Sequence, residues 1–221
     1  MNPHHARPSP PADQSDKEAE ALRVVKEALA KYGAGGLGLA FNGGKDCTVV
    51  LALLERTLDQ SELRQVDIVH FRESGQELFE EALAFIRATE ERLGIKVREV
   101  EGGVRQGLWS EHRRRPEVKA WLTGRRASDP HAYLEGHFTP CSDGWPPLMR
   151  VAPLLNWSYS HVWALLAGPA GVPYCSLYDQ GFTSLGSKDA SARNPALRRD
   201  DGSYQPAWML QDGTSERHGR E

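Results

Sequence analysis

Short apolar runs alternate with amphipathic stripes through the first half of this chain. Apolar spacing typical of helices covers residues 16–32, 47–58 and 76–93, and a basic helical stretch ends at Arg115. The runs between them are typical of strands and cover residues 37–41, 66–71, 95–100 and 120–123. Strands and helices that alternate at these lengths form βαβ units. We therefore predict an α/β fold whose mostly parallel sheet is flanked by helices on both faces.

The second half of the chain differs from the first in composition and in hydrophobic pattern. Residues 124–221 hold nine of the fourteen prolines and four of the six tryptophans, and only residues 159–167 have a clear helical pattern. The tryptophans argue against disorder, because disordered segments are poor in aromatic residues. We expect a single domain over residues 16–221. Its α/β core would be residues 16–123, and residues 124–221 would form a loop-rich wall over the carboxyl edge of the sheet.

Residues 1–15 carry four prolines and no hydrophobic periodicity, so we expect a flexible tail there. The chain has 27 Lys and Arg against 30 Asp and Glu, a net charge of −3, which argues against a generally basic surface for nucleic acid. No apolar run approaches the ~20 residues that span a bilayer, and the first residues lack the apolar stretch of a secretory signal. We expect a cytoplasmic monomer without nucleic-acid or membrane partners.

Three scattered cysteines and eight histidines make a disulfide framework or a zinc site an unfavourable interpretation. The cysteines show no Cys-x-x-Cys spacing, and the histidines form no His-x-x-x-His pair. An odd number of cysteines without paired spacing is typical of a reducing compartment.

The segment from Phe41 to Cys47 carries the sharpest local signal. It reads Phe-Asn-Gly-Gly-Lys-Asp-Cys and lies between a predicted strand and a predicted helix. Gly43 and Gly44 let the backbone approach an anion, and the amides at the start of a helix direct positive partial charge at it. Asp46 can cap the helix or hold a magnesium ion that bridges phosphates. The Walker and dinucleotide glycine patterns are absent, so these residues alone leave both a phosphate site and an ordinary turn open.

Further segments follow in an order that resembles the eukaryotic FAD synthetases (FMN adenylyltransferases). These belong to the adenine nucleotide alpha hydrolase superfamily, which has a Rossmann-like fold and also contains the phosphoadenylyl-sulfate (PAPS) reductases. The glycine loop is similar to the pyrophosphate loop of that superfamily. The resemblance runs along nearly the whole chain from about residue 20, through residues 124–130, 145–150, 153–159, 172–187, 194–197 and 216–220. Ala127 stands where relatives usually carry a second basic residue, which implies that one phosphate or flavin contact is missing.

This resemblance implies that the chain transfers the AMP part of ATP to the phosphate of FMN, giving FAD and pyrophosphate with Mg²⁺ as cofactor. The FMN phosphate would attack the α-phosphorus directly, so the protein would act by aligning two anions and neutralising their charge. The loop-rich second half would then be the flavin-binding region.

The resemblance also implies roles for individual residues. Those implied to be catalytic are Asn42, Asp46, Asp129, Arg217 and Arg220, with Asp46 as the metal ligand. Those implied to bind ATP and its phosphates are Phe41, Asn42, Gly43, Gly44, Lys45, Asp46, His70 and Arg126. Those implied to bind FMN are Asp129, Trp145, Arg150, Tyr178, Arg217 and Arg220.

Position in the chain adds physical reasons for some of these assignments. Asp129 precedes a proline, which holds it extended, and it is expected where FMN meets ATP. Arg217 and Arg220 are three apart and can share one helical face to close over phosphates. Without the resemblance, a solvated tail is the better interpretation of these two arginines.

Two other functions stay open. A PAPS reductase-like enzyme would share the loop and the sheet, but its chemistry needs a reactive cysteine near the C-terminus, and no cysteine follows Cys175. A catalytically silent protein that binds flavin or adenine nucleotide would keep the same residues without turnover.

Overall fold

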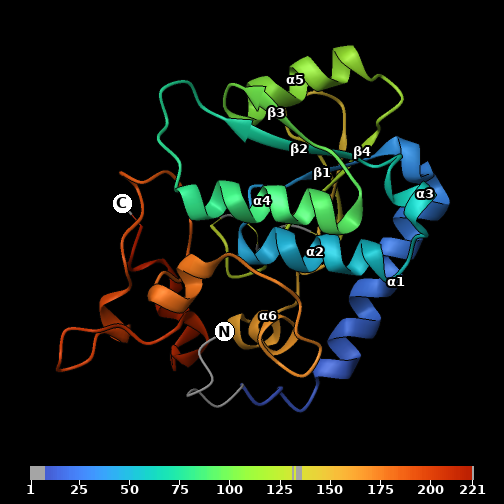
Figure 1. Cartoon of the computed structure of the whole chain (residues 1–221). Helices are drawn as coiled ribbons and strands as arrows, with labels where there is room; N and C mark the ends of the chain where they lie inside the picture. Colours follow the sequence, from blue (N-terminus) through green and yellow to red (C-terminus); the bar gives the residue numbers. More distant parts are fainter. Residues whose placement is uncertain (1–7, 131, 133–135, 221) are drawn as a thin grey trace.

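A parallel sheet with one antiparallel edge strand organises the computed structural model, which describes residues 8–130, 132 and 136–220 (Figure 1). Within these residues the sheet has six strands in the order β3-β2-β1-β4-β6-β5. The strands are β1 (Leu37–Ala40), β2 (Asp67–Arg72), β3 (Val97–Glu101), β4 (Ala120–Leu122), β5 (Phe138–Pro140) and β6 (Met149–Val151). Only the pairing of β5 with β6 is antiparallel. The predicted mostly parallel sheet is confirmed.

Helices cover both faces of this sheet, as predicted. They are α1 (Gln14–Tyr32), α2 (Lys45–Glu55), α3 (Gln60–Leu63), α4 (Glu80–Leu93), α5 (Val104–Arg114) and α6 (Tyr159–Leu166). Figure 1 shows α5 on one side of the strands, and α2 and α4 on the other. None of the helices in the described ranges combines the length and hydropathy that a membrane crossing requires.

Each face of the sheet has its own apolar core. On the side of α5, Leu108 packs with strand residues Val69 and Trp121. On the other side, a larger cluster joins strand residues such as Leu39 to α1, α2 and α6. Because side chains alternate along a strand, neighbouring apolar residues of one strand supply opposite cores.

Helix α2 lies inside the larger core, and its N-terminal end borders the candidate site. It begins at Lys45, two residues before the predicted start, and nearly all of its residues are buried. The β-branched and leucine side chains from Val49 to Leu54 pack against β1, α1 and α6. This packing fixes the direction of α2, whose N-terminus points to the carboxyl edge of the sheet.

Two predictions about the second half and the N-terminus need correction. Strands β5 and β6 come from residues 124–221, so this half supplies part of the sheet as well as loops. β5 reads Phe-Thr-Pro and β6 reads Met-Arg-Val, so both lack the unbroken apolar run of β4 (Ala-Trp-Leu), and the sequence pattern did not reveal them. Helix α1 begins at Gln14, so residues 14 and 15 are helical and not part of a tail. Residues 1–7 of the predicted tail lie outside the described residues.

An aromatic cluster attaches the loop-rich segment to the core. Trp163 of α6 is 1% exposed. Its ring centroid lies 5.4 Å from that of Tyr174, 5.2 Å from that of Tyr178 and 5.9 Å from that of Trp208. Trp163 and Tyr178 are buried in the core, and Tyr174 and Trp208 pack against it partly buried.

We expect Trp163→Ala to lower the free energy of unfolding by about 3–5 kcal/mol, because it removes the ring that the other three contact. Urea denaturation followed by circular dichroism would measure the loss. Trp109→Ala, which removes a half-buried indole on α5, serves as the control and is expected to cost about 1 kcal/mol or less. Equal losses in the two variants would contradict the role given to Trp163.

Candidate active site

The loop between β1 and α2 is held by bonds within itself. Gly43 has a φ of +75°, a left-handed conformation that glycine adopts without strain. The Asn42 Oδ1 atom accepts a hydrogen bond from the Gly44 amide at 3.0 Å and one from the Cys47 Sγ at 3.3 Å. The amide of Lys45 donates to the Tyr178 hydroxyl at 2.8 Å, which joins the loop to the second half of the chain. The side-chain NH₂ of Asn42 can still donate to a ligand.

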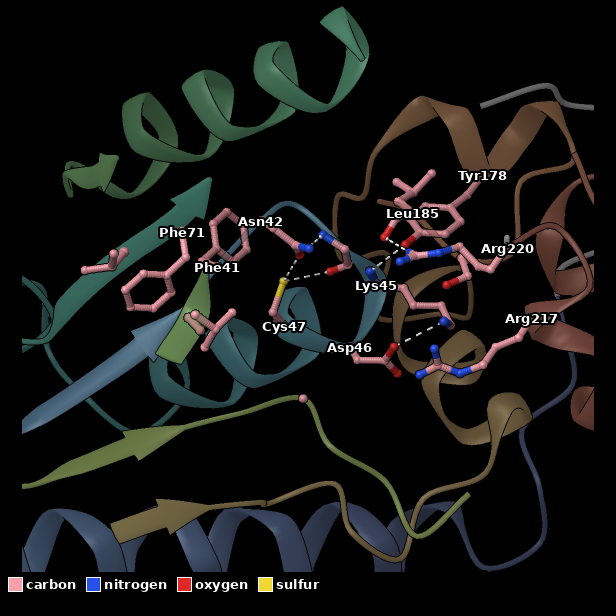
Figure 2. A pocket seen from close by; sticks show the side chains of 16 residues that line it. Phe41, Asn42, Lys45, Asp46, Cys47, Phe71, Tyr178, Leu185, Arg217 and Arg220 are labelled. Carbon is pink, nitrogen blue, oxygen red and sulfur yellow. Dashed lines mark hydrogen bonds and ion pairs between the residues drawn. The ribbon is translucent and has the colours of Figure 1, made fainter. Parts of the chain in front are cut away.

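A polar pocket of about 350 Å³ opens over this loop (Figure 2). Phe41 and Phe71 lie at one end of it, where β1 and β2 reach the carboxyl edge of the sheet, and Arg217 and Arg220 enter from the C-terminal segment opposite. The remaining lining residues include Asn42, Gly44, Lys45, Asp46, Cys47, Gly124, Tyr178 and Leu185. Backbone amides at a helix start and two arginines make this pocket suited to an anion.

An apolar pocket of about 540 Å³ adjoins the polar one. Its walls include Leu108, Trp121, Asp129, Cys141, Trp145, Leu148 and Arg150. The residues that line both pockets are Ala40, Phe71, Val104, Gly124 and Arg217. Because the two pockets share these residues, ligands bound in them would meet beside Arg217.

Four alternating charges lie behind the glycine loop. The Lys45 Nζ atom is 3.1 Å from Asp46 Oδ2 and 3.2 Å from Glu216 Oε1. The Arg126 Nε atom is 3.0 Å from Asp46 Oδ1, an ion pair without hydrogen-bond geometry. The Arg126 Nη2 atom donates to both Glu216 oxygens, at 2.6 and 2.5 Å. We call these four residues the charge cluster.

The charge cluster is neutral as a whole and largely buried. Lys45 and Arg126 are each 2% exposed, whereas the Asp46 side chain is 25% exposed and faces the polar pocket. Burial alone would lower the pKa of the Arg126 guanidinium, but the carboxylates of Asp46 and Glu216 hold that pKa above its ordinary value. Arg126 is therefore a permanent cation beneath the loop.

Asp129 connects the charge cluster to the outer arginine. Its Oδ2 atom accepts from the Arg126 amide at 2.9 Å, and its Oδ1 atom accepts from Arg217 Nη2 at 2.8 Å. Burial raises the pKa of Asp129, but these two hydrogen bonds outweigh it and lower the pKa overall. Asp129 stays ionised at neutral pH and holds the Arg217 guanidinium at the border of the two pockets.

A smaller pocket of about 160 Å³ continues from the polar one through Asn42, Phe71 and Arg220. His70 lines it and is mostly buried, and this burial lowers the pKa of its imidazole. The Arg220 Nη1 atom donates to the carbonyl of Leu185 at 2.5 Å, and burial lowers the pKa of this guanidinium too.

The structure contains no all-protein metal cage within its described residues, since no three His, Cys, Asp or Glu side chains come together there. Mg²⁺ does not require one, because it commonly takes one or two carboxylates and completes its shell with water and substrate phosphates. The partly exposed Asp46 carboxylate in the polar pocket fits that arrangement.

Comparison with known proteins identifies the family. Residues 105–192 match the model of the phosphoadenosine phosphosulfate reductase domain. The chain is 33% identical to a probable FAD synthase of Schizosaccharomyces pombe over 205 residues. This aligned region covers 90% of this chain and 77% of the relative. The chain belongs to the FAD synthase family.

Other FAD synthase relatives are longer, and a solved structure shares the fold. A probable FAD synthase of Caenorhabditis briggsae is 39% identical over 209 residues, which are 92% of this chain but 40% of the relative. The chain thus spans less than half the length of that relative. The FMN adenylyltransferase of Candida glabrata has the same fold, with a TM-score of 0.85, 24% identity and coverage of 95% of this chain and 88% of that chain.

Most residues that the FAD synthase resemblance implied line the polar or the apolar pocket, but His70 lines only the smaller third pocket. Arg126 lines neither pocket and is buried in the charge cluster. Gly43 shapes the loop but is not among the lining residues, and Tyr178 lies under the loop in the polar pocket rather than beside Trp145. Ala127 is exposed and lines neither pocket, so the structure does not connect it with a missing ligand contact.

Sequence reasoning did not single out three residues that the structure brings to the two pockets or the charge cluster. Phe71 and Val104 line both pockets, and Glu216 belongs to the charge cluster. Glu216 lies in the C-terminal segment 216–220 that resembles the family, and this position was the one indication in the sequence that Glu216 belongs to the site. Its burial between two cations arises only from tertiary contacts.

We expect His70 to lower the free energy of unfolding of the protein in acid. Its folded pKa lies below the unfolded value of about 6.5, so protons bind the unfolded chain more strongly. The contribution of neutral His70 is present above pH ~6.5 and is lost as the pH falls through the folded pKa. Between about pH 7 and pH 5, the free energy of unfolding should fall less in His70→Gln than in the wild type, as measured by urea denaturation. Parallel curves would contradict this expectation.

Proposed function

We propose that this protein is an FMN adenylyltransferase, which transfers AMP from ATP to FMN and releases FAD and pyrophosphate. The observation that carries the proposal is the pair of adjoining pockets, one polar and one apolar, that meet at Gly124 and Arg217. A helix-start loop with cations suits a triphosphate, and an apolar pocket with Trp145 suits a flat ring system. The Candida glabrata enzyme of the same fold has been solved in complex with FMN and an ATP analogue, which supports this assignment.

The reaction needs two anions to approach each other. An oxygen of the FMN phosphate attacks the α-phosphorus of ATP, and the bond from that phosphorus to the bridging oxygen of the pyrophosphate breaks. The protein need supply no covalent nucleophile, so its contribution is alignment and charge neutralisation. Asn42 and the amides of the glycine loop would hold the phosphates, and Lys45 and Arg220 would add positive charge.

Arg217 would contact both substrates at the point where they meet, because it is the charged residue that lines both pockets. Asp129 fixes its guanidinium by the 2.8 Å hydrogen bond and would itself lie beside the flavin phosphate. Both halves of the chain line each pocket, so we infer that neither substrate is held by residues 16–123 or 124–221 alone.

Mg²⁺ would be held by Asp46 together with the phosphates of the nucleotide. When bound, it would neutralise charge that develops on the phosphate oxygens. Asp46 would have to exchange its contacts with Lys45 and Arg126 for the metal. The strength with which these two cations hold Asp46 would therefore affect how readily Asp46 binds the metal.

The cysteines argue against the reductase alternative. Burial raises the pKa of the Cys47 thiol to about 12 and that of the Cys175 thiol to about 11, so neither forms a thiolate at neutral pH. Cys141 is half-buried in the wall of the apolar pocket. A silent binding protein remains the other alternative, and a turnover measurement distinguishes it.

We expect the wild type to form FAD and pyrophosphate from ATP, FMN and Mg²⁺, as followed by chromatography. Asp46→Asn and Asp129→Asn should each lower kcat by about 100-fold or more, because each removes a charge that orients a reacting group. Asp200→Asn, which neutralises an exposed carboxylate outside both pockets, is the matched control and should leave the rate unchanged. Absence of FAD, or full activity in both site variants, would refute the proposal.

Cys141 provides an independent test of where FMN binds. We expect iodoacetamide to label this thiol in the folded protein, whereas Cys175 is buried and Cys47, although it lines the polar pocket, has a thiol pKa raised to about 12, so both react far more slowly until the chain unfolds. With FMN at roughly ten times its dissociation constant, labelling of Cys141 should slow about tenfold, since the reagent needs the empty pocket. Peptide mass spectrometry would locate the label. Equal labelling with and without FMN would exclude the apolar pocket as the flavin site.

A further inference from the structure

Glu216 stands directly before Arg217, and its carboxylate is buried beneath the glycine loop. It accepts from Lys45 Nζ at 3.2 Å and from Arg126 Nη2 at 2.6 and 2.5 Å. It lines neither the polar nor the apolar pocket, so it would not touch either substrate. Its partner Lys45 does line the polar pocket, so any effect of Glu216 on a ligand must pass through Lys45 or the charge cluster.

The backbone at Glu216 is fixed from the other side. Its carbonyl accepts from Thr183 Oγ1 at 2.6 Å. Asn194 Nδ2 in turn donates to Thr183 Oγ1 at 3.0 Å and to the carbonyl of Ser215 at 2.8 Å. Thr183 and Asn194 are fully buried. The Glu216 carboxylate is therefore held at a defined place, and it can in turn define the places of Lys45 and Arg126.

The charge count around Asp46 explains what Glu216 contributes. The cluster balances two cations with two carboxylates. Without the Glu216 charge, Asp46 would be the one cluster carboxylate left for both Lys45 and Arg126, with Asp129 acting on Arg126 only from outside the cluster, and buried cations without enough counter-charge are costly. They would hold the Asp46 carboxylate more tightly, against its engagement by a metal–phosphate complex.

We propose that Glu216 is a positioning residue for the nucleotide: it satisfies Lys45 and Arg126 so that Asp46 can turn to the metal-bound triphosphate. This inference rests on the proposed function for the identity of the nucleotide. A positioning role for Glu216 differs from a purely structural role in one measurable respect. Nucleotide binding in the polar pocket should depend on Glu216, whereas FMN binding in the apolar pocket should not, since Lys45, Asp46 and Glu216 all lie outside that pocket.

The test compares Glu216→Gln, which keeps the shape and removes the charge, with Glu216→Asp, which keeps the charge on a shorter stem. Glu111→Gln is the matched control. Glu111 is also buried and paired with two cations, Arg98 and Arg114, and it lines neither pocket. Calorimetry would measure ATP binding with and without Mg²⁺, flavin fluorescence would measure FMN binding, and thermal melting would measure stability.

We expect Glu216→Gln to weaken Mg²⁺-ATP binding by at least about tenfold, because it removes a buried charged partner. FMN binding should stay within about twofold of the wild type, and the loss should be larger with Mg²⁺ than without it. Glu216→Asp should recover a measurable part of the loss. Glu111→Gln should lower the melting temperature and leave both affinities unchanged.

Two results would overturn the proposal: unchanged Mg²⁺-ATP affinity in Glu216→Gln, or equal losses of ATP and FMN affinity, which would mean a structural role. If Glu216→Gln does not fold, Glu216→Asp decides by the same comparison between ATP and FMN. Wild-type protein that binds Mg²⁺-ATP in a Glu216-dependent way but makes no FAD would refute the proposed function and leave this inference standing.

Discussion

The charge cluster of Lys45, Asp46, Arg126 and Glu216 is the interaction on which the rest of the site depends. It joins three segments that lie far apart in the chain: the glycine loop, the start of the second half, and the C-terminal segment. Asp129 and Arg217 extend the same chain of contacts to the border of the two pockets. A buried group of alternating charges requires all of its members, because each cation or carboxylate left alone would be costly.

This arrangement places positive charge where two anionic substrates would meet, on a chain whose net charge is −3. Two of the site's cations, Lys45 and Arg126, are neutralised by carboxylates behind the loop. Lys45 lines the polar pocket together with Arg217, which is paired with Asp129, and with Arg220 and the N-terminal amides of α2. The positive potential is therefore local and directed, and the remaining surface needs no basic excess.

The position of the two pockets follows from the α/β fold of the chain. Parallel strands bring the ends of β1, β2 and β4 to one edge of the sheet, so Phe41, Phe71 and Gly124 come together there. Helix α5 covers one side of that edge and contributes Val104 to both pockets. The aromatic cluster around Trp163 holds the loop-rich segment against α6, which supports Tyr178 under the glycine loop.

The sequence by itself determined the α/β class, the four strands of the first half and the glycine loop, because these depend on local periodicity and on glycines at a strand–helix junction. It also indicated Asp46, Asp129, Arg217 and Arg220, through motifs that resemble a family. Only the tertiary structure decided that β5 and β6 complete the sheet, that Arg126 is buried behind the loop, and that Glu216 holds it there. A three-residue strand that contains a polar residue, such as β5 or β6, has no recognisable pattern, and an ion pair between residues 90 positions apart leaves no local pattern in a single sequence.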